Sequence, residues 1–472
     1  MVTTTRGRIA PGPKGRPILG SLPDFQRDIV GTFMQARREF GDVVHFKGPL
    51  EVYLVAHPDH VDHVLHADHR NYRHPDFEIK KLRPTFRNGL VTSQGEFWLR
   101  QRRLAQPGFH RQKITKFGEI MTDITSEMLA GWHTYAEQRQ VVDIRPIMQR
   151  LTLTILAKAM FSVDWSHDAV AVMDAVTVAN EYTNARLLAP PWADLPEWVP
   201  VPSTRRFLQK RQAVDDLVYK LIGERRRLGQ DMGDLLSMLM EARDEDTGEG
   251  MSDLQLHDEL ISMIFAGHET VSTCLTWTWY LISKNACIAE RLQAELTEVL
   301  GGRTPTVDDI PRLSFTTMLI QESLRLYPPI WLVPRTNLND DEIGGYHIPA
   351  GSMVFLVPYV THRHPDFWDN PEGVDPERFT PARSVGRPRY AWFPFGGGPR
   401  QCIGNSFALL EMQLIVALVA QQFRLNLVEG HRVELQPMVT LRPRYGMRMI
   451  VEQVSKPTTR LSSPAGAAAP GQ

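Results

Sequence analysis

The chain has 472 residues, of which 42% are hydrophobic, and a formal net charge of −1. This composition allows a large core, and the near-zero charge gives no electrostatic case for a nucleic-acid partner. Three scattered cysteines exclude a disulfide framework and indicate a reducing compartment. No run of 18 apolar residues and no signal-peptide pattern occurs, so we expect a soluble cytoplasmic protein without a transmembrane anchor.

The N-terminal part of the chain alternates between short elements and loops. Residues 1–21 are rich in proline and glycine and are expected to cross the surface without regular structure. An amphipathic helix then runs to about Phe40, and the segments 43–46 and 52–55 read as two short strands joined by a turn. Residues 72–94 show no clean period, which predicts a long loop.

Trp98 and Arg102 stand four residues apart in a helical stretch, so they share one face of the helix. An indole N–H and a guanidinium group together suit a partly buried anion. The stretch also contains Arg100 and Arg103, so an exposed basic helix is the competing interpretation.

Two core helices follow, the second at 144–162, because apolar residues recur at helical spacing. Five prolines between positions 190 and 202 then interrupt the chain, with Trp192 and Trp198 among them. These tryptophans either contact a membrane surface or pack within the protein. Ser203 is expected to cap the next helix.

Residues 252–283 give the longest helical pattern, and a capping box at Ser252 begins it. Ala266 and Gly267 lie near its middle. A glycine inside a helix costs about 1 kcal/mol relative to alanine, so its presence indicates a specific reason. We expect the missing side-chain volume to let a flat cofactor and a diatomic ligand lie against this helix.

Glu269 and Thr270 follow at once and place a carboxylic acid and a hydroxyl beside this gap. Two simpler interpretations remain open. The Thr270 hydroxyl can bond back to the carbonyl of residue 266, and Glu269 can lie on a solvated face.

Glu322 and Arg325 are three residues apart in another helix and can form an ion pair. The same E-x-x-R pattern at Glu224 reads as an ordinary exposed helix, so the pattern is weak by itself. Residues 331–335 and 353–357 then read as strands.

The most informative stretch has the form F-x-x-G-x-R-x-C-x-G and runs from Phe395 to Gly404. A thiolate is a strong metal ligand, and glycines let backbone N–H groups approach its sulfur closely. Arg400 and the N-terminus of a helix that continues to about Phe423 add positive potential around Cys402. These features suit one thiolate on an iron atom, whereas a buried cysteine in a glycine-rich turn is the alternative.

This stretch resembles the haem-binding loop of the cytochrome P-450 superfamily, and five motifs occur in that family's order between residues 11 and 450. The resemblance implies one mainly α-helical (α+β) haem domain with small β-sheets over residues 22–454. The segment 455–472 is then a disordered tail. It also implies haem b as the cofactor and Cys402 as the axial ligand of its iron.

The resemblance further implies a role for each matching residue. The residues implied to hold the cofactor besides Cys402 are Trp98, Arg102, Arg335, Arg400, Phe395, Gly404, Ala266 and Gly267. Thr270 is implied as the proton donor or water-positioning group, with Glu269 as the relay to solvent. A buried structural triad is implied for Glu322, Arg325 and Arg378. The residues implied to line a substrate pocket are Phe265, Ala266, Ile330, Leu332, Val333 and Val439.

The implied reaction is monooxygenation, in which one oxygen atom of O₂ hydroxylates or epoxidises a hydrophobic small molecule. Terpenoids, fatty acids and polyketides all suit an apolar pocket. No flavin or ferredoxin module is visible, so electrons are expected from a separate ferredoxin or flavodoxin and its reductase. The basic residues that could dock such a partner, or simply form a solvated face, are Arg100, Arg102, Arg103, Arg111, Lys113 and Lys116.

Two other functions are weighed against this one. A haem-thiolate peroxygenase or rearrangement enzyme usually lacks the acid–threonine pair, which this chain retains as Glu269 and Thr270. A non-enzymatic haem protein that senses gas or carries electrons would need an output domain, or would need neither pocket nor lid. The sequence shows no such domain, and it offers the 72–94 loop and the proline-rich lid.

Overall fold

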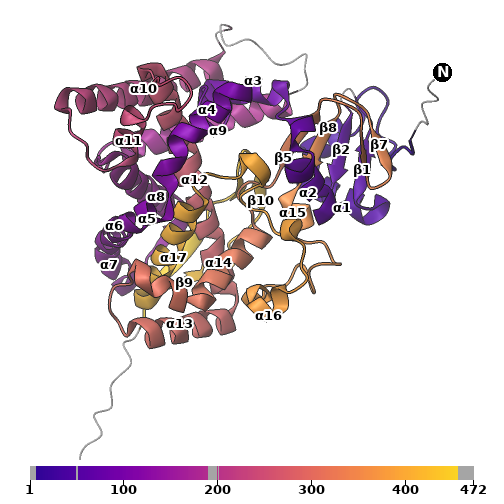
Figure 1. Cartoon of the computed structure of the whole chain (residues 1–472). Coiled ribbons are helices and arrows are strands. Elements are labelled where there is room, and N and C mark those ends of the chain that lie inside the picture. The colour runs from indigo at the N-terminus through magenta and orange to yellow at the C-terminus, as the bar shows by residue number, and fades with distance from the viewer. Residues whose placement is uncertain (1–6, 49–50, 190–198, 200, 455–472) are drawn as a thin grey trace, which may run out of the picture.

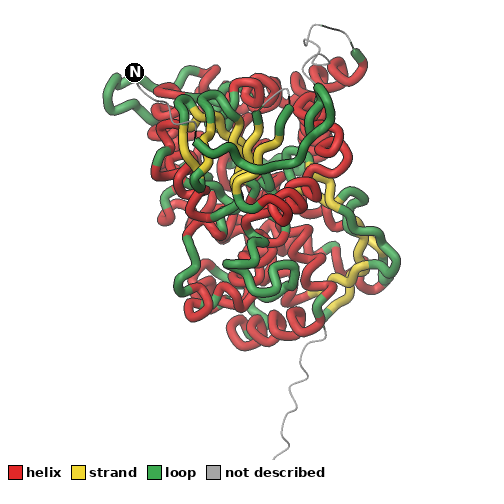
Figure 2. Tube along the Cα trace, turned by 90° about the vertical axis from the view of Figure 1, so that its right-hand side faces the viewer, coloured by secondary structure: helices red, strands yellow, loops and turns green. Residues whose placement is uncertain are grey.

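The computed structural model describes residues 7–48, 51–189, 199 and 201–454. Helices form the larger part of the molecule, and a strand-rich part lies to one side, next to the N-terminal helix α1 (Figure 1). Seen from the side, the strands gather in two separate places among the helices (Figure 2). Among the described residues, none of the helices is both long enough and apolar enough to span a bilayer.

The largest sheet has five strands in the order β1-β2-β8-β5-β3. Their bounds are β1 (Val43–Phe46), β2 (Val52–Val55), β8 (Met353–Leu356), β5 (Val333–Asn337) and β3 (Tyr72–Arg73). Strands β2 and β8 pair in parallel, and the other neighbours are antiparallel. Helix α1 (Leu22–Phe40) packs on this sheet through Phe33, whose ring meets those of Phe46 and Phe355. The two strands predicted near the N-terminus are confirmed.

The helical part is built around α12 (Asp253–Lys284), a helix of 32 residues that begins with the predicted capping box of Ser252 and Gln255. Helix α8 (Ile144–Phe161) packs along it, and three further helices contact it: α14 (Ser314–Leu326), α17 (Asn405–Gln422) and α10 (Pro202–Leu228). Helix α6 (Gly118–Ala130) lies against α8 and α17. The indole N–H of Trp277 donates to Leu441 O at 2.8 Å and so ties α12 to the C-terminal strands.

The remaining elements complete the shell around this centre. The other α-helices are α2 (Pro58–Asp62), α3 (Asp76–Phe86), α4 (Gly95–Ala105), α5 (Arg111–Ile114), α7 (Trp132–Glu137), α9 (Ala169–Leu188), α11 (Leu235–Glu241), α13 (Ala286–Leu300), α15 (Pro358–Thr361) and α16 (Pro381–Ser384). The other strands are β4 (Val141–Asp143), β6 (Asp341–Ile343), β7 (Tyr346–Ile348), β9 (Phe423–Leu427), β10 (Leu435–Pro437), β11 (Leu441–Pro443) and β12 (Arg448–Gln453).

The prediction of one long loop at 72–94 is wrong. Strand β3 and helix α3 occupy its first two thirds, and α3 buries Ile79, Leu82 and Phe86 at spacings of three and four residues. Pro84 lies in the last turn of this helix and breaks the apparent pattern, since proline usually ends a helix.

The predicted cap at Ser203 is also wrong. Helix α10 begins at Pro202, and Val201 is its N-cap residue. Proline is favoured at the first helical position, so it sets the start of the helix and Ser203 lies inside it. Trp192, Trp198 and the predicted tail 455–472 fall outside the described residues.

Candidate active site

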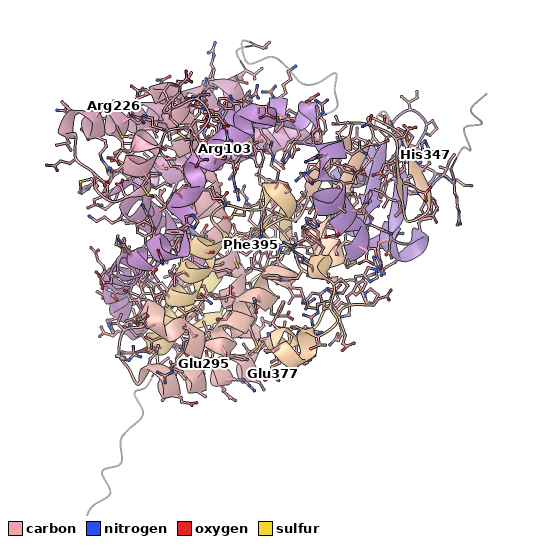
Figure 3. The ribbon with its side chains drawn as sticks, in the orientation of Figure 1. Arg103, Arg226, Glu295, His347, Glu377 and Phe395 are labelled. Atoms are coloured by element: carbon pink, nitrogen blue, oxygen red, sulfur yellow. The ribbon has the colours of Figure 1, made fainter. Side chains whose placement is uncertain are left out.

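The loop from Phe395 to Gly404 enters α17 near the centre of the molecule, where Phe395 is labelled in Figure 3. The amide of Cys402 donates to Phe395 O at 2.9 Å and closes the loop. Gly398 adopts a φ of +63°, and a Cβ there would lie 1.7 Å from Leu65 O. No residue with a side chain fits at Gly398, which explains a glycine of the motif by close backbone approach.

The Cys402 thiol faces a pocket. Burial among protein atoms raises the pKa of the thiol, whereas the amide of Gly404 and the charge of Arg102 lower it. The side chain nevertheless retains exposed surface. The other residues that line this pocket are Arg102, Gln106, Phe109, His110, Gln401, Ile403 and Asn405. The sulfur is thus enclosed by the fold yet open to a ligand.

Three arginines from three different elements converge near this loop. Arg102 on α4 donates to Gln401 O at 2.9 Å, Arg400 donates to Ser93 O at 2.9 Å, and Arg335 on β5 donates to Pro334 O at 2.8 Å. The Arg400 guanidinium also lies 3.8 Å from the centre of the Trp98 ring. Four of the residues implied to hold the cofactor, Trp98, Arg102, Arg335 and Arg400, are therefore brought together.

The three guanidinium groups of this arginine cluster (Arg102, Arg335 and Arg400) would be stabilised by a nearby negative charge. Burial, with the charges of Arg335 and Arg102, lowers the pKa of Arg400 to about 9. Burial lowers the pKa of Arg335 to about 10, and only the nearby Glu78 opposes this shift. Because these three hydrogen bonds go to backbone carbonyls, the two carboxylates of a haem b would fit here as counter-charges.

His74 and Glu78 belong to the same region, although sequence reasoning missed both. Burial and the charges of Arg335 and Arg400 lower the pKa of His74. Burial raises the pKa of Glu78 to about 8 against the charge of Arg335, and its Oε2 has no hydrogen-bond partner among the described residues. The helical spacing of Ile79, Leu82 and Phe86 was the signal that could have placed them on a helix.

On α12, Ala266 and Thr270 stand one turn apart and are both partly exposed. The Thr270 hydroxyl donates to Ala266 O at 2.8 Å, which confirms the back-bonded interpretation of this side chain. Its oxygen lone pairs remain available as acceptors.

The structure gives Gly267 a different reason from the one expected. A Cβ there would lie 2.8 Å from Cδ1 of Leu156 on α8. The glycine therefore permits close packing of α12 on α8, and the expectation that its missing side chain makes room for a cofactor is wrong.

Glu269 is only 2% exposed, so the solvated interpretation of this residue is wrong. Its Oε2 accepts a hydrogen bond from Gln149 Nε2 on α8 at 2.6 Å. Its Oε1 accepts one from the Thr440 hydroxyl at 3.2 Å and lies 3.7 Å from Arg145 Nη2. These partners lie more than 100 residues away in sequence, so no local sequence pattern predicts them.

The predicted pocket residues divide among different apolar clusters. Phe265 meets Phe86 of α3 edge to face at 5.9 Å, and Val439 packs against the same helical core. Leu332 packs instead with the cluster under α1, and Val333 with the cluster under the large sheet. Ile330 is partly exposed just before β5. The structure thus pairs Phe265 with Phe86, which sequence reasoning did not select, and places Val439 against the same large core cluster.

The charged triad is confirmed in its geometry. Both oxygens of Glu322 accept hydrogen bonds from Arg325 at 2.7 Å, and Arg378 Nε lies 3.4 Å from Oε1. Glu322 and Arg325 are fully buried and Arg378 is 3% exposed. Arg325 also donates to His362 O, and the His362 ring accepts from the amide of Phe393, so the triad supports the start of the cysteine loop.

The predicted basic docking face is not formed as expected. Arg103 pairs with Asp244 at 3.1 Å and with Asp246 at 2.8 Å, and Arg100 donates to two backbone carbonyls. Arg102 points inward to the cysteine loop. At least three of the six cations are therefore already engaged within the protein.

Comparisons with known proteins agree with this site. The family model described as "Cytochrome P450" matches residues 10–449. Cyclooctatin synthase of Streptomyces melanosporofaciens is 35% identical over 439 residues, covering 92% of this chain and 94% of the relative. Cyclooctat-9-en-7-ol 5-monooxygenase of the same organism is 34% identical, with coverages of 89% and 90%.

A third relative, pentalenene oxygenase of Streptomyces avermitilis, is 31% identical, covering 91% of this chain and 92% of the relative. The crystal structure of the cytochrome P450DA heme domain superposes with a TM-score of 0.86 at 27% identity. That match covers 96% of this chain and 99% of the solved one.

Proposed function

We propose that this chain, which belongs to the cytochrome P450 family, oxidises a cyclic terpenoid. It is a haem-thiolate monooxygenase that inserts one oxygen atom of O₂ into a hydrophobic small molecule. The observation that carries the reaction class is the pocket-facing Cys402 thiol beside the arginine cluster.

Haem b is the cofactor, and the residues present fit it. Cys402 would hold the iron, and Arg102, Arg335 and Arg400 would neutralise its two carboxylates. When bound, the haem supplies the activation of O₂ by two electrons. The protein holds the cofactor, excludes water and moves protons.

Proton delivery falls to two neighbouring side chains of α12. The Thr270 hydroxyl donates its hydrogen bond to Ala266 O. Its oxygen therefore acts as an acceptor, and we propose that it holds a water in the pocket. Glu269 passes protons from solvent toward that water. We assign Thr270 the positioning of the water and Glu269 the relay.

The substrate class follows from two observations taken together. Two relatives are named for acting on cyclooctat-9-en-7-ol and pentalenene, which are cyclic terpenoids. In this chain α3 and α12 meet through the rings of Phe86 and Phe265, with Val439 in the same apolar cluster. Rigid apolar walls of this kind suit a compact hydrocarbon, whose binding rests on buried apolar area.

Two spectra test this function in order. The dithionite-reduced protein under carbon monoxide should give a strongly red-shifted Soret band, which reports a thiolate on the haem iron. Cyclic terpenes and terpene alcohols should then shift the spin state of the oxidised protein, and linear fatty acids of equal carbon number should not. A spin-state shift with fatty acids alone would overturn the terpenoid assignment, whereas the assignment as a monooxygenase would stand.

Electrons reach the site from a separate ferredoxin and reductase in this proposal. Arg100, Arg102 and Arg103 are engaged within the protein. We therefore expect the ferredoxin to dock through other residues of the surface nearest to Cys402. Reconstitution with a ferredoxin–reductase pair should support turnover. Charge reversal at Arg103 should then leave the low-salt electron-transfer rate unchanged.

A further inference from the structure

The Glu269 carboxylate is held away from solvent by two elements that flank α12. Gln149 of α8 bonds one oxygen and Thr440, between β10 and β11, bonds the other. A carboxylate has about four acceptor positions, so two hydrogen bonds leave capacity for more. The proton relay therefore needs a route by which protons reach a buried group.

Arg145 stands at one end of that route. Its Nη2 is 3.7 Å from Glu269 Oε1, too far for a direct hydrogen bond. Its Nε and Nη2 are buried and donate to no described group. A buried donor without a partner costs about 1–3 kcal/mol, so an arrangement that satisfies these N–H groups is favoured. A small rotation of Glu269 that closes this gap, or a shift that widens it enough to admit one bridging water, provides it.

Arg145 also reaches the surface, whereas Glu269 does not. The side chain of Arg145 is 19% exposed and that of Glu269 is 3% exposed. The backbone of Arg145 is fixed, because its amide donates to Asp143 at 3.1 Å in the first turn of α8. A guanidinium on this fixed turn spans the distance between solvent and the carboxylate.

A second cation, Arg442 of β11, faces the same region but is committed elsewhere. It is 4% exposed and donates to Gln436 Oε1 at 3.2 Å and to Met438 Sδ at 2.6 Å. Burial and the charge of Arg145 lower the pKa of Arg442, and the charges of Glu269 and Glu181 oppose this shift. Of these two cations, Arg145 is the one with both solvent contact and unused donors.

We infer that Arg145 is a positioning residue that admits protons to Glu269 between α8 and β11. This inference rests on the relay role proposed for Glu269. The guanidinium stays protonated throughout and orients a water. That water gives one proton to the carboxylate and regains one from solvent. Glu269 then carries the proton to the Thr270 side of α12.

The test compares two arginines of the same helix. Arg145→Gln removes the positioned cation, and Arg150→Gln, one and a half turns later on the exposed face, is the matched control. Product formed per NADPH should fall about tenfold in R145Q, less than the roughly 100-fold effect of losing a general acid, because Glu269 remains. The solvent isotope effect on turnover should rise, and substrate-induced spin shifts should stay unchanged. R150Q should match the wild type, and R145K should recover part of the coupling.

Two further variants separate the possible failures. If Glu269→Gln uncouples the enzyme while R145Q keeps wild-type coupling and isotope effect, the role of Arg145 is overturned and that of Glu269 stands. If E269Q itself stays coupled, the proposed relay fails, and this inference fails with it. Arg145→Met keeps most of the apolar length of the side chain and keeps the inference testable should R145Q not fold. R145M should lose coupling as R145Q does, and wild-type coupling in R145M would contradict the inference.

Discussion

At the scale of single residues, the Thr270 hydroxyl donates a hydrogen bond to Ala266 O at 2.8 Å, which leaves its oxygen as an acceptor. In the function proposed here, a water that donates to this oxygen moves the protons, and Thr270 sets the position of that water.

Thr270→Ala should therefore keep haem and substrate binding and lose coupling. Electrons from NADPH are expected to leave as hydrogen peroxide, with product per NADPH reduced about tenfold or more. Peroxide and product assays on the same reaction measure this directly. Thr154→Ala, on the exposed side of α8, is the control. Wild-type product yield in T270A would remove Thr270 from the mechanism.

Arg335 illustrates the second residue-scale effect, a buried charge in need of a counter-charge. It is 7% exposed and donates a hydrogen bond to Pro334 O. Arg335→Leu should weaken haem retention, since a lost charge-assisted hydrogen bond is worth about 1.5–3 kcal/mol. Transfer of haem to apomyoglobin should speed up about tenfold or more, and Arg103→Gln on the surface should leave the rate unchanged. Equal rates in R335L and wild type would exclude Arg335 from the haem site.

At the scale of elements, the segment after α3 is anchored to the helices beneath it by a polar network. Arg87 ends α3 at a φ of +56° and pairs with Asp215 of α10. The His257 ring of α12 bonds Asp215 at 3.1 Å and Asp258 at 3.0 Å. The amide of Leu90 donates to Glu259 at 3.0 Å.

This anchor should weaken as pH rises. Burial lowers the pKa of His257, but hydrogen bonds to Asp215 and Asp258 raise it more, so the net pKa lies above 6.5. Its stabilisation is complete below pH 6.5 and is lost as pH rises through the folded-state pKa. Burial raises the pKa of Glu259 to about 8, and a raised acid pKa likewise lowers stability between its unfolded value and pH 8.

Hydrogen exchange of the amides in residues 86–94, corrected for intrinsic rates, should therefore accelerate between pH 6.5 and 9. His257→Gln should make this corrected exchange rate less dependent on pH. His167→Gln, at an exposed position, serves as the control. A pH-independent protection in the wild type would contradict the anchor.

Local periodicity explains which elements were predictable. The strands at 43–46 and 52–55 and the helix from Ser252 each carry their signal within a few residues. Helix α3 carries no such clear signal, because Pro84 interrupts the helical pattern of its sequence. Sequence reasoning therefore placed no helix there and did not select His74 or Glu78 as site residues. The partners of Glu269 come from α8 and from the turn before β11, and only the packing of distant elements places them there. Gly267 was explained wrongly for the same reason, since Leu156 lies more than 100 residues earlier.

For the whole molecule, the triad of Glu322, Arg325 and Arg378 connects α14 to the segment that leads into the cysteine loop. Arg325 donates to the carbonyls of His362, Pro371 and Gly373 as well as to Glu322. Removal of one member would strand buried charges in a region that supports the haem ligand.

Glu322→Ala should cost about 3–5 kcal/mol of folding free energy, and little holoprotein should accumulate. Glu224→Ala provides a matched control, because Glu224 occupies the same E-x-x-R pattern on the exposed face of α10. Thermal unfolding and haem content report both variants. Equal stability of E322A and E224A would mean that the triad is dispensable.

The parallel pairing of β2 with β8 has a consequence for biosynthesis. Val55 pairs with Leu356, so the N-terminal hairpin waits for a partner about 300 residues downstream. At roughly 5–20 residues per second, that wait lasts about 15–60 s on the ribosome. The edge of β2 stays unpaired during this time, and non-local pairing is slow even afterwards. Cys402, the proposed iron ligand, emerges later still and reaches a chain whose sheet is only then closing. Faster synthesis of the segment up to Leu356 should therefore shorten this exposure and raise the yield of haem-loaded protein, which haem content per purified chain measures.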